Sequence, residues 1–415
     1  MILIRSLATV AVTLAVGACA GPGTGTTGHG HARSRPTIPV VTAPVHATSA
    51  YRLSELAMTT TGRENGLFLD YQSPLCRIGV AATSDGGARF TAPVTVTTWR
   101  CASNPPAGQV AFDSRGDGFV YGPGLFVSHD GGRTWAAPNT LRDVLAVAPL
   151  GRSVWLLQAR CPPVKPAQAQ YCPLRLLTSA NGGRTWAPAA SQPSASVPGY
   201  GGSVPAEPAV GQSFLVRTGP QSGYVAALAV TPYPVVPGHH AQGRLWFTAD
   251  GGRSWSRRAT PCTGMGDAVS AAPDGALFAV CADEPGAGEQ GKTVERSLNG
   301  GHTWTSGESC GIGRCMGVLG FGYLGEIAAV DARTVYLVGD RSPLLVTHDG
   351  GKTWFIVKAV AAGSDAGTYQ VLFFNRSDGL VIGVDDKPPY YPQQPTIWWT
   401  HDGGARWAAV HPAIG

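Results

Sequence analysis

The sequence predicts an all-β fold built from repeated four-stranded units. Its 415 residues include 56 glycines and 33 prolines, which favour many turns. Eleven Trp, 12 Tyr and 12 Phe supply apolar side chains for a core, and only 14% of the residues are charged. One short motif also recurs at spacings of 45 to 69 residues, a period typical of repeat folds. Together these features exclude a fully disordered chain and a coiled coil.

The recurring motif is an octapeptide with Ser or Thr first, Asp or Asn third, two glycines next and Trp or Phe last. Seven copies occur, at residues 83–90, 128–135, 179–186, 248–255, 297–304, 347–354 and 400–407. Asp and Asn bond the backbone of their own turn, and glycines adopt positive φ without a steric penalty. The motif therefore predicts seven turns with structural third residues, namely Asp85, Asp130, Asn181, Asp250, Asn299, Asp349 and Asp402. We expect the histidines that precede three of them, His129, His348 and His401, to be solvated.

This octapeptide closely resembles the Asp-box, or BNR repeat, of sialidase-like β-propellers, where it forms the turn between the third and fourth strands of a blade. Short apolar runs before each copy fit the other strands, and in the second unit they are 110–112, 119–121 and 125–127. The resemblance implies a single seven-bladed β-propeller over residues 51–415, with four-stranded antiparallel blades and an Asp-box in each 3–4 turn. How the ring closes is left open.

The N-terminus predicts export. Residues 1–19 contain Arg5 and a short apolar stretch, and they end in Val16-Gly17-Ala18-Cys19, which resembles a bacterial lipobox. That resemblance implies a lipoprotein signal peptide, lipidation at Cys19 and anchorage to the outer face of the bacterial cytoplasmic membrane. The alternative is an ordinary signal peptide with a chance cysteine. Residues 20–50 are rich in Gly, Thr and Pro and are predicted to form a flexible tether.

The other eight cysteines are even in number, which predicts disulfides in an exported chain. They fall in sequential pairs: Cys76 with Cys101, Cys161 with Cys172, Cys262 with Cys281, and Cys310 with Cys315. A zinc site is the competing interpretation, but no Cys-x-x-Cys spacing favours it. The sequence predicts neither a metal nor another cofactor.

Charge argues against a nucleic-acid partner. The formal net charge is +5, and no run of Lys or Arg occurs anywhere in the chain. We therefore expect membrane contact through the lipid anchor only, and a monomeric protein.

Strand order predicts which face of the propeller is functional. The 1–2 and 3–4 turns share one face, and the 2–3 and 4–1 connections share the other. The long insertions, at residues 161–172, 188–211, 231–243, 305–325 and 385–395, all fall in 2–3 or 4–1 connections. Long connections on a rigid scaffold are a common place for binding, so we expect the ligand on this long-loop face.

A polar residue recurs at the entry to the first strand of every unit, close to the expected ring axis. These residues are Glu55, Gln109, Asp143, Gln212, Asp267, Glu326 and Gln370, with Arg52 and Arg142 nearby. One interpretation is a ligand site, whose acidic groups would favour cations, amines or hydroxyls. The other is that the side chains bond the backbones of neighbouring blades.

Two function classes compete. The run Tyr51-Arg52-Leu53-Ser54 is similar to the first-arginine motif of sialidases, but Ser54 replaces its proline and the arginine triad is incomplete. Sialidases also have six blades. The seven-unit exported form resembles photosystem II assembly-factor propellers and BNR-repeat lipoproteins. We therefore expect a non-catalytic binding or assembly module for an envelope protein or glycan, with a sialidase-like exo-glycoside hydrolase as the alternative.

Overall fold

The structure is a computed structural model. It describes residues 52–60, 63–70, 75–100, 108–122, 124–138, 141–162, 169–200, 213–227, 244–262, 265–282, 290–310, 319, 322–323, 325–339, 341–360, 367–384 and 395–414. The predicted signal peptide, Cys19 and the tether lie outside these residues. No helix in the described part of the chain reaches the length and apolarity needed to cross a bilayer.

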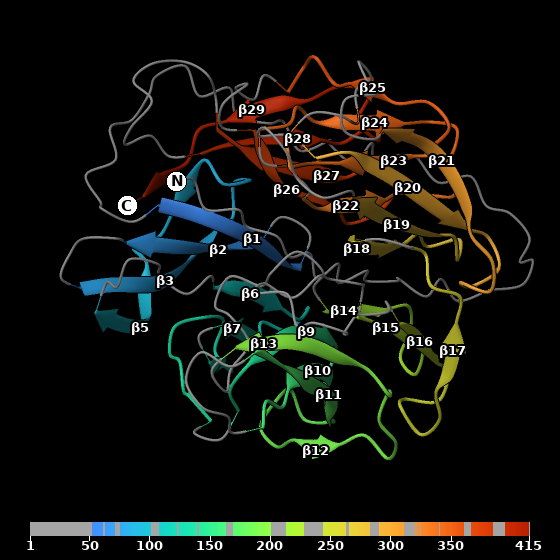
Figure 1. The fold of residues 1–415 in the computed structure, drawn as a ribbon. Helices are drawn as coiled ribbons and strands as arrows, with labels where there is room; N and C mark the ends of the chain where they lie inside the picture. The colour runs from blue at the N-terminus through green and yellow to red at the C-terminus, as the bar shows by residue number, and fades with distance from the viewer. Residues whose placement is uncertain are drawn as a thin grey trace, which may run out of the picture.

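The described residues form seven blades around a ring (Figure 1). Blade 1 contains β1 (Arg52–Thr60), β2 (Arg63–Asp70), β3 (Leu75–Thr83) and β5 (Val94–Arg100), and blade 2 contains β6 (Gln109–Phe112), β7 (Gly118–Tyr121) and β8 (Leu125–Ser128). Blade 3 contains β9 (Val144–Leu150), β10 (Ser153–Ala159), β11 (Ala169–Ser179) and β12 (Ala187–Pro188), with β13 (Ser196–Tyr200) added to β11. Blade 4 contains β14 (Ser213–Arg217), β15 (Gly223–Ala227), β16 (Arg244–Thr248) and β17 (Ser256–Arg258).

The last three blades follow the same order. Blade 5 contains β18 (Met265–Ala271), β19 (Leu277–Ala282), β20 (Lys292–Ser297) and β21 (Thr305–Cys310). Blade 6 contains β22 (Ile327–Ala329), β23 (Val335–Leu337), β24 (Leu345–Thr347) and β25 (Phe355–Ile356), and blade 7 contains β26 (Thr368–Phe373), β27 (Gly379–Gly383), β28 (Thr396–Thr400) and β29 (Ala408–Val410). In blade 2 the fourth strand is reduced to a bridge between Val127 and Ala136. The predicted seven-bladed, antiparallel all-β propeller is confirmed.

The ring closes through a short strand at the C-terminus. β30 (Ala413–Ile414) pairs in parallel with β4 (Arg89–Phe90), which consists of the last two residues of the first Asp-box. The Ala413 N–H donates to the carbonyl of Ala88 at 3.0 Å. The described ends of the chain therefore lie close together (Figure 1). Each blade keeps strands from one continuous stretch of chain, and the closing strand forms a separate two-stranded sheet with β4.

The apolar core lies between the blades. Alternate residues of β2 face opposite neighbours, as the two-residue period of a strand requires. Leu67 packs in a cluster with Val110 of blade 2, whereas Phe68 packs in a cluster with Ile397 of blade 7. Blade 1 therefore buries apolar side chains against both of its neighbours.

Two of the predicted disulfides are present, Cys161–Cys172 and Cys262–Cys281. Cys76 is also disulfide-bonded, while its predicted partner Cys101 lies outside the described residues. Cys310 ends β21, and Cys315 lies outside the described residues.

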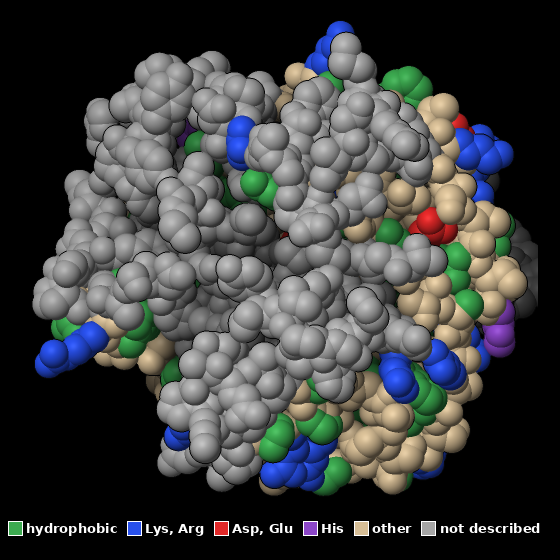
Figure 2. Space-filling view, in the orientation of Figure 1, with side chains coloured by type: hydrophobic (Ala, Val, Ile, Leu, Met, Phe, Trp, Pro, Cys, Tyr) green, Lys and Arg blue, Asp and Glu red, His purple; other side chains and the backbone are tan. Residues whose placement is uncertain are grey.

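The charged side chains of the described residues are separated from one another on the face shown in Figure 2. Figure 2 shows the Lys and Arg side chains scattered around the rim, and not gathered in one broad patch. This distribution agrees with the absence of a Lys or Arg run in the sequence.

Candidate functional site

The Asp-boxes dock on the 1–2 turns of their own blades, which agrees with the predicted division of the two faces. The first box glycine donates its N–H to a carbonyl of that turn in several blades. Gly251 donates to Gln221 at 2.7 Å, and Gly403 donates to Ser377 at 2.9 Å. These turns therefore form one face, which we call the Asp-box face, and the 2–3 and 4–1 connections leave from the opposite, long-loop face.

Each box is held by a network around its third residue. In blade 2, Ser128 Oγ donates to Asp130 Oδ1 at 2.8 Å, and the Thr134 N–H donates to the same oxygen at 2.9 Å. The Thr134 hydroxyl donates to Asp130 Oδ2 at 2.6 Å. These bonds, led by that from the Thr134 hydroxyl, lower the pKa of Asp130 to about 2. The carboxylate thus uses its oxygens as acceptors for hydrogen bonds within its own turn.

Two of the histidines beside the boxes keep partly exposed rings, as expected, and each also contacts a carboxylate. His129 Nδ1 lies 2.9 Å from Asp117 Oδ1, and His401 Nδ1 lies 2.7 Å from Asp378 Oδ1. Each acidic partner sits at the end of the 1–2 turn of the same blade. The histidines therefore link that turn to the box, which sequence alone did not indicate.

Three of the predicted ring residues bond the backbone of the next blade. Glu55 Oε2 accepts the N–H of Val110 at 2.9 Å. Glu326 Oε2 accepts the N–H of Val371 at 3.2 Å. Gln370 reaches from blade 7 to blade 1, where it accepts from the Leu56 N–H at 2.9 Å and donates to the Leu56 carbonyl at 3.1 Å. For these three side chains, the structure supports the second interpretation, in which they bond the backbones of neighbouring blades.

Irregular strand pairing accompanies this contact. The β1–β2 register shifts between Leu53 and Glu55, and the β26–β27 register shifts between Thr368 and Gln370. A bulge of this kind turns a side chain away from the regular alternation of a strand. The bulges therefore help Glu55 and Gln370 to reach the adjoining blade.

The other predicted ring residues are placed as follows. Gln109 is buried at the start of β6. Asp143 has a positive φ of 52°, and its carbonyl accepts the Ala159 N–H at 3.0 Å. Arg142 is exposed beside it. Arg52 lies in β1 and Asp267 inside β18, both with side chains outside the description, and Gln212 lies outside the described residues.

Two further links between blades carry no signal in the sequence. Ser270 Oγ accepts the N–H of Ala329 at 3.0 Å, which joins blades 5 and 6. Arg217 of blade 4 is 4% exposed. Its guanidinium donates to the carbonyl of Ser153 in blade 3 at 2.7 Å and to the Ser153 hydroxyl at 2.8 Å. Burial lowers the pKa of Arg217 to about 10. A strand-end arginine gives no indication in sequence that it will be buried.

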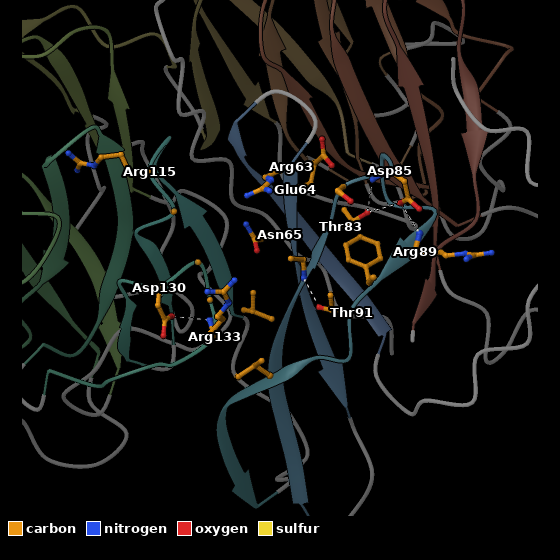
Figure 3. Close-up of a pocket in the computed structure, with 18 of the residues that line it drawn as sticks. Arg63, Glu64, Asn65, Thr83, Asp85, Arg89, Thr91, Arg115, Asp130 and Arg133 are labelled. Atoms are coloured by element: carbon orange, nitrogen blue, oxygen red, sulfur yellow. Dashed lines mark hydrogen bonds between the residues drawn. The ribbon is translucent and has the colours of Figure 1, made fainter. Parts of the chain in front are cut away.

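A hollow of about 880 Å³ opens on the Asp-box face at blades 1 and 2 (Figure 3). Its lining includes Glu64, which is 3% exposed and whose Oε2 accepts no hydrogen bond from the described residues. Burial, and then the nearby charge of Asp85, raise the pKa of Glu64 to about 7. Sequence analysis missed this residue because the run Arg63-Glu64-Asn65 has the polarity of an exposed turn. The described residues contain no cluster of His, Cys, Asp or Glu able to hold a metal.

Comparison with known proteins supports the repeat assignment. The family model described as BNR/Asp-box repeat matches residues 126–137. No curated protein matches the chain in sequence. The fold and the seven boxes together define this protein as a β-propeller of BNR/Asp-box repeats.

Solved structures share the general architecture. YCF48 bound to D1 peptide is 16% identical, with a TM-score of 0.49, and the match covers 84% of this chain and 96% of that one. YCF48 from Cyanidioschyzon merolae is 17% identical, with a TM-score of 0.48 over 82% and 95% of the two chains. The GH74 xyloglucanase from Xanthomonas campestris is 13% identical, with a TM-score of 0.48, and the match covers 86% of this chain and 60% of that one. These likenesses are loose, so the assignment rests on the boxes and the blades.

Proposed function

We propose that this protein is an exported, lipid-anchored propeller that acts as a non-catalytic binding or assembly module at the outer face of the cytoplasmic membrane. Its partner would be an envelope protein or a glycan bound on the long-loop face. Cys19 would carry the lipid, and residues 20–50 would place the propeller at a distance from the bilayer.

One observation carries the non-catalytic part of this proposal. The two axial carboxylates whose bonds are known, Glu55 and Glu326, each accept a backbone N–H from the next blade. Glycoside hydrolysis needs two carboxyl groups that can reach the substrate and exchange protons. Carboxylates that hold blades together are poorly suited to that task, and this favours binding over hydrolysis.

The shape of the scaffold supports the choice of face. The boxes occupy the opposite face with tight turns, and their acidic groups bond their own backbone. Within two of the predicted long connections, residues 196–200 form β13 and residues 305–310 form β21; the strand ends that the long connections join lie on the other side of the ring. Long connections on a rigid ring form variable binding surfaces in many folds.

Four measurements test the proposal. Crosslinking in intact cells, followed by affinity purification, should recover one envelope protein with the wild-type chain, and a glycan array should detect binding if the partner is a sugar. The Cys19→Ala variant should lose labelling by a fatty-acid analogue and leave the membrane fraction. Equal labelling of wild type and variant would contradict the anchor. Turnover of a sialoside substrate by the purified chain would contradict the non-catalytic role.

A further inference from the structure

Two buried polar side chains line the hollow on the Asp-box face. Glu64 and Asn65 are neighbours at the start of β2, and they are 3% and 4% exposed. Both line the hollow, and Figure 3 shows Asn65 between Glu64 and Arg133 in that view. A buried carboxyl oxygen without a donor loses free energy relative to water, and a ligand that supplies the donor would recover it.

Guanidinium groups lie along the rest of the lining. Arg63, Arg89, Arg115 and Arg133 all contribute. Arg115 is paired with Asp113 at 2.9 Å. Neither Arg89 nor Arg133 forms an ion pair with a carboxylate within the described ranges, and both are exposed. Figure 3 shows Arg89 and Arg133 on opposite sides of the hollow, and Arg133, which lies on the side of Asn65, remains available for an anion.

The lining is thus complementary to a ligand that carries two different groups. A lone cation would meet repulsion from the rim arginines, and a lone carboxylate would leave the Glu64 oxygen without a donor. A molecule with an ammonium group and a separate carboxylate satisfies both ends. The volume of about 880 Å³ is far larger than one amino acid needs and lies within the range of pockets for drug-sized ligands.

We propose that this hollow binds a short peptide, or the end of a longer one, with an ammonium group on Glu64 and a carboxylate on Arg133. The Asn65 amide is placed to bond the peptide backbone between the two ends. This site lies on the face opposite the proposed partner surface, and it does not depend on the proposed function.

Binding should depend on pH through Glu64. The charged and titratable groups around it are Asp85 of the first box, Arg63 beside it, Arg89 of β4, and Arg115, His129, Asp130 and Arg133 of blade 2. The pKa of Glu64 is raised to about 7, so the acid is mostly protonated at pH 6 and mostly ionised at pH 8. An ammonium ligand binds the ionised form, so affinity should rise roughly tenfold over this interval.

The test uses the full chain and isothermal titration calorimetry. The probe is the peptide acetyl-Lys-Gly-Gly, whose lysine ammonium stays charged from pH 6 to pH 8 while its C-terminus, two glycines away, supplies the carboxylate. Two matched peptides each remove one group: the C-terminal amide lacks the carboxylate, and the version acetylated on the lysine side chain lacks the ammonium. We expect binding of the first peptide only, and tighter binding at pH 8 than at pH 6.

Substitutions in the protein test which residue binds each end of the peptide. Glu64→Gln should lower the affinity for the probe and abolish the pH dependence of that affinity. Arg133→Gln should lower the affinity at both pH values. Arg257→Gln, at an exposed arginine of β17, is the control and should leave affinity unchanged. No heat of binding with millimolar probe, equal affinity for the amidated peptide, or an unchanged pH profile in Glu64→Gln would each overturn the proposal.

Discussion

The buried Glu64 carboxyl should make the folded protein less stable at neutral than at acidic pH, and Glu64→Gln should remove that effect. The pKa of this group rises from 4.5 to about 7 on folding, so the folded state holds a proton that the unfolded state has released between these values. The stability contributed by the protonated group is therefore present below pH 4.5 and is lost as pH rises to 7. A rise of this size corresponds to about 3 kcal/mol.

Glutamine has the shape of the acid and never ionises. Urea unfolding of both proteins between pH 4 and pH 8 should show nearly equal free energies at the acidic end. At pH 8 the variant should be more stable by about 3 kcal/mol, and the difference should grow only between pH 4.5 and 7. Glu295→Gln is a suitable control, because Glu295 is also buried but accepts a hydrogen bond from Ser306 at 2.7 Å. A stability difference between Glu64→Gln and wild type that does not change with pH would refute the reasoning.

Three further predictions concern the scaffold. Gln370→Ala leaves the buried N–H and carbonyl of Leu56 without partners, so chemical denaturation should show a loss of about 2–4 kcal/mol, and a loss below that of an exposed control would contradict the role in closing the ring. Arg217→Met should cost about 3 kcal/mol in the same assay, since it leaves carbonyls of blades 3 and 4 unbonded; an unchanged midpoint would contradict this. Burial opposes ionisation of Asp349, but hydrogen bonds from Thr353 and Thr347 lower its pKa to about 2, so it stabilises the fold above pH 4 and the benefit is lost as pH falls towards 2. Asp349→Ala should therefore cost about 1–2 kcal/mol at pH 7, whereas Asp349→Asn should cost little; equal losses would show that the box network is not the cause.

Sequence predicted the blades because the box repeats at a fixed place in each unit. Two glycines and a short polar side chain determine the turn locally, so the prediction did not depend on distant contacts. Ring closure depends on such contacts. β30 is two residues long, and nothing in Ala413 and Ile414 indicates that they will pair with β4.

The site residues show the same division. Sequence placed Glu55, Glu326 and Gln370 near the axis, but their bonds to the next blade depend on how the blades pack and on bulges in their strands. Glu64 escaped notice because its burial comes from the tertiary structure around the start of β2. Polarity along a chain cannot distinguish an exposed turn from a strand end covered by a neighbouring element.

The most direct test of the proposed function asks which face meets the partner in intact cells. A photo-crosslinking amino acid would replace either Arg142, exposed at the long-loop end of blade 3, or Lys352, exposed in the Asp-box of blade 6. We predict a discrete crosslinked product from position 142 and none from position 352. A product from position 352 alone would contradict the account, because it would place the partner on the Asp-box face.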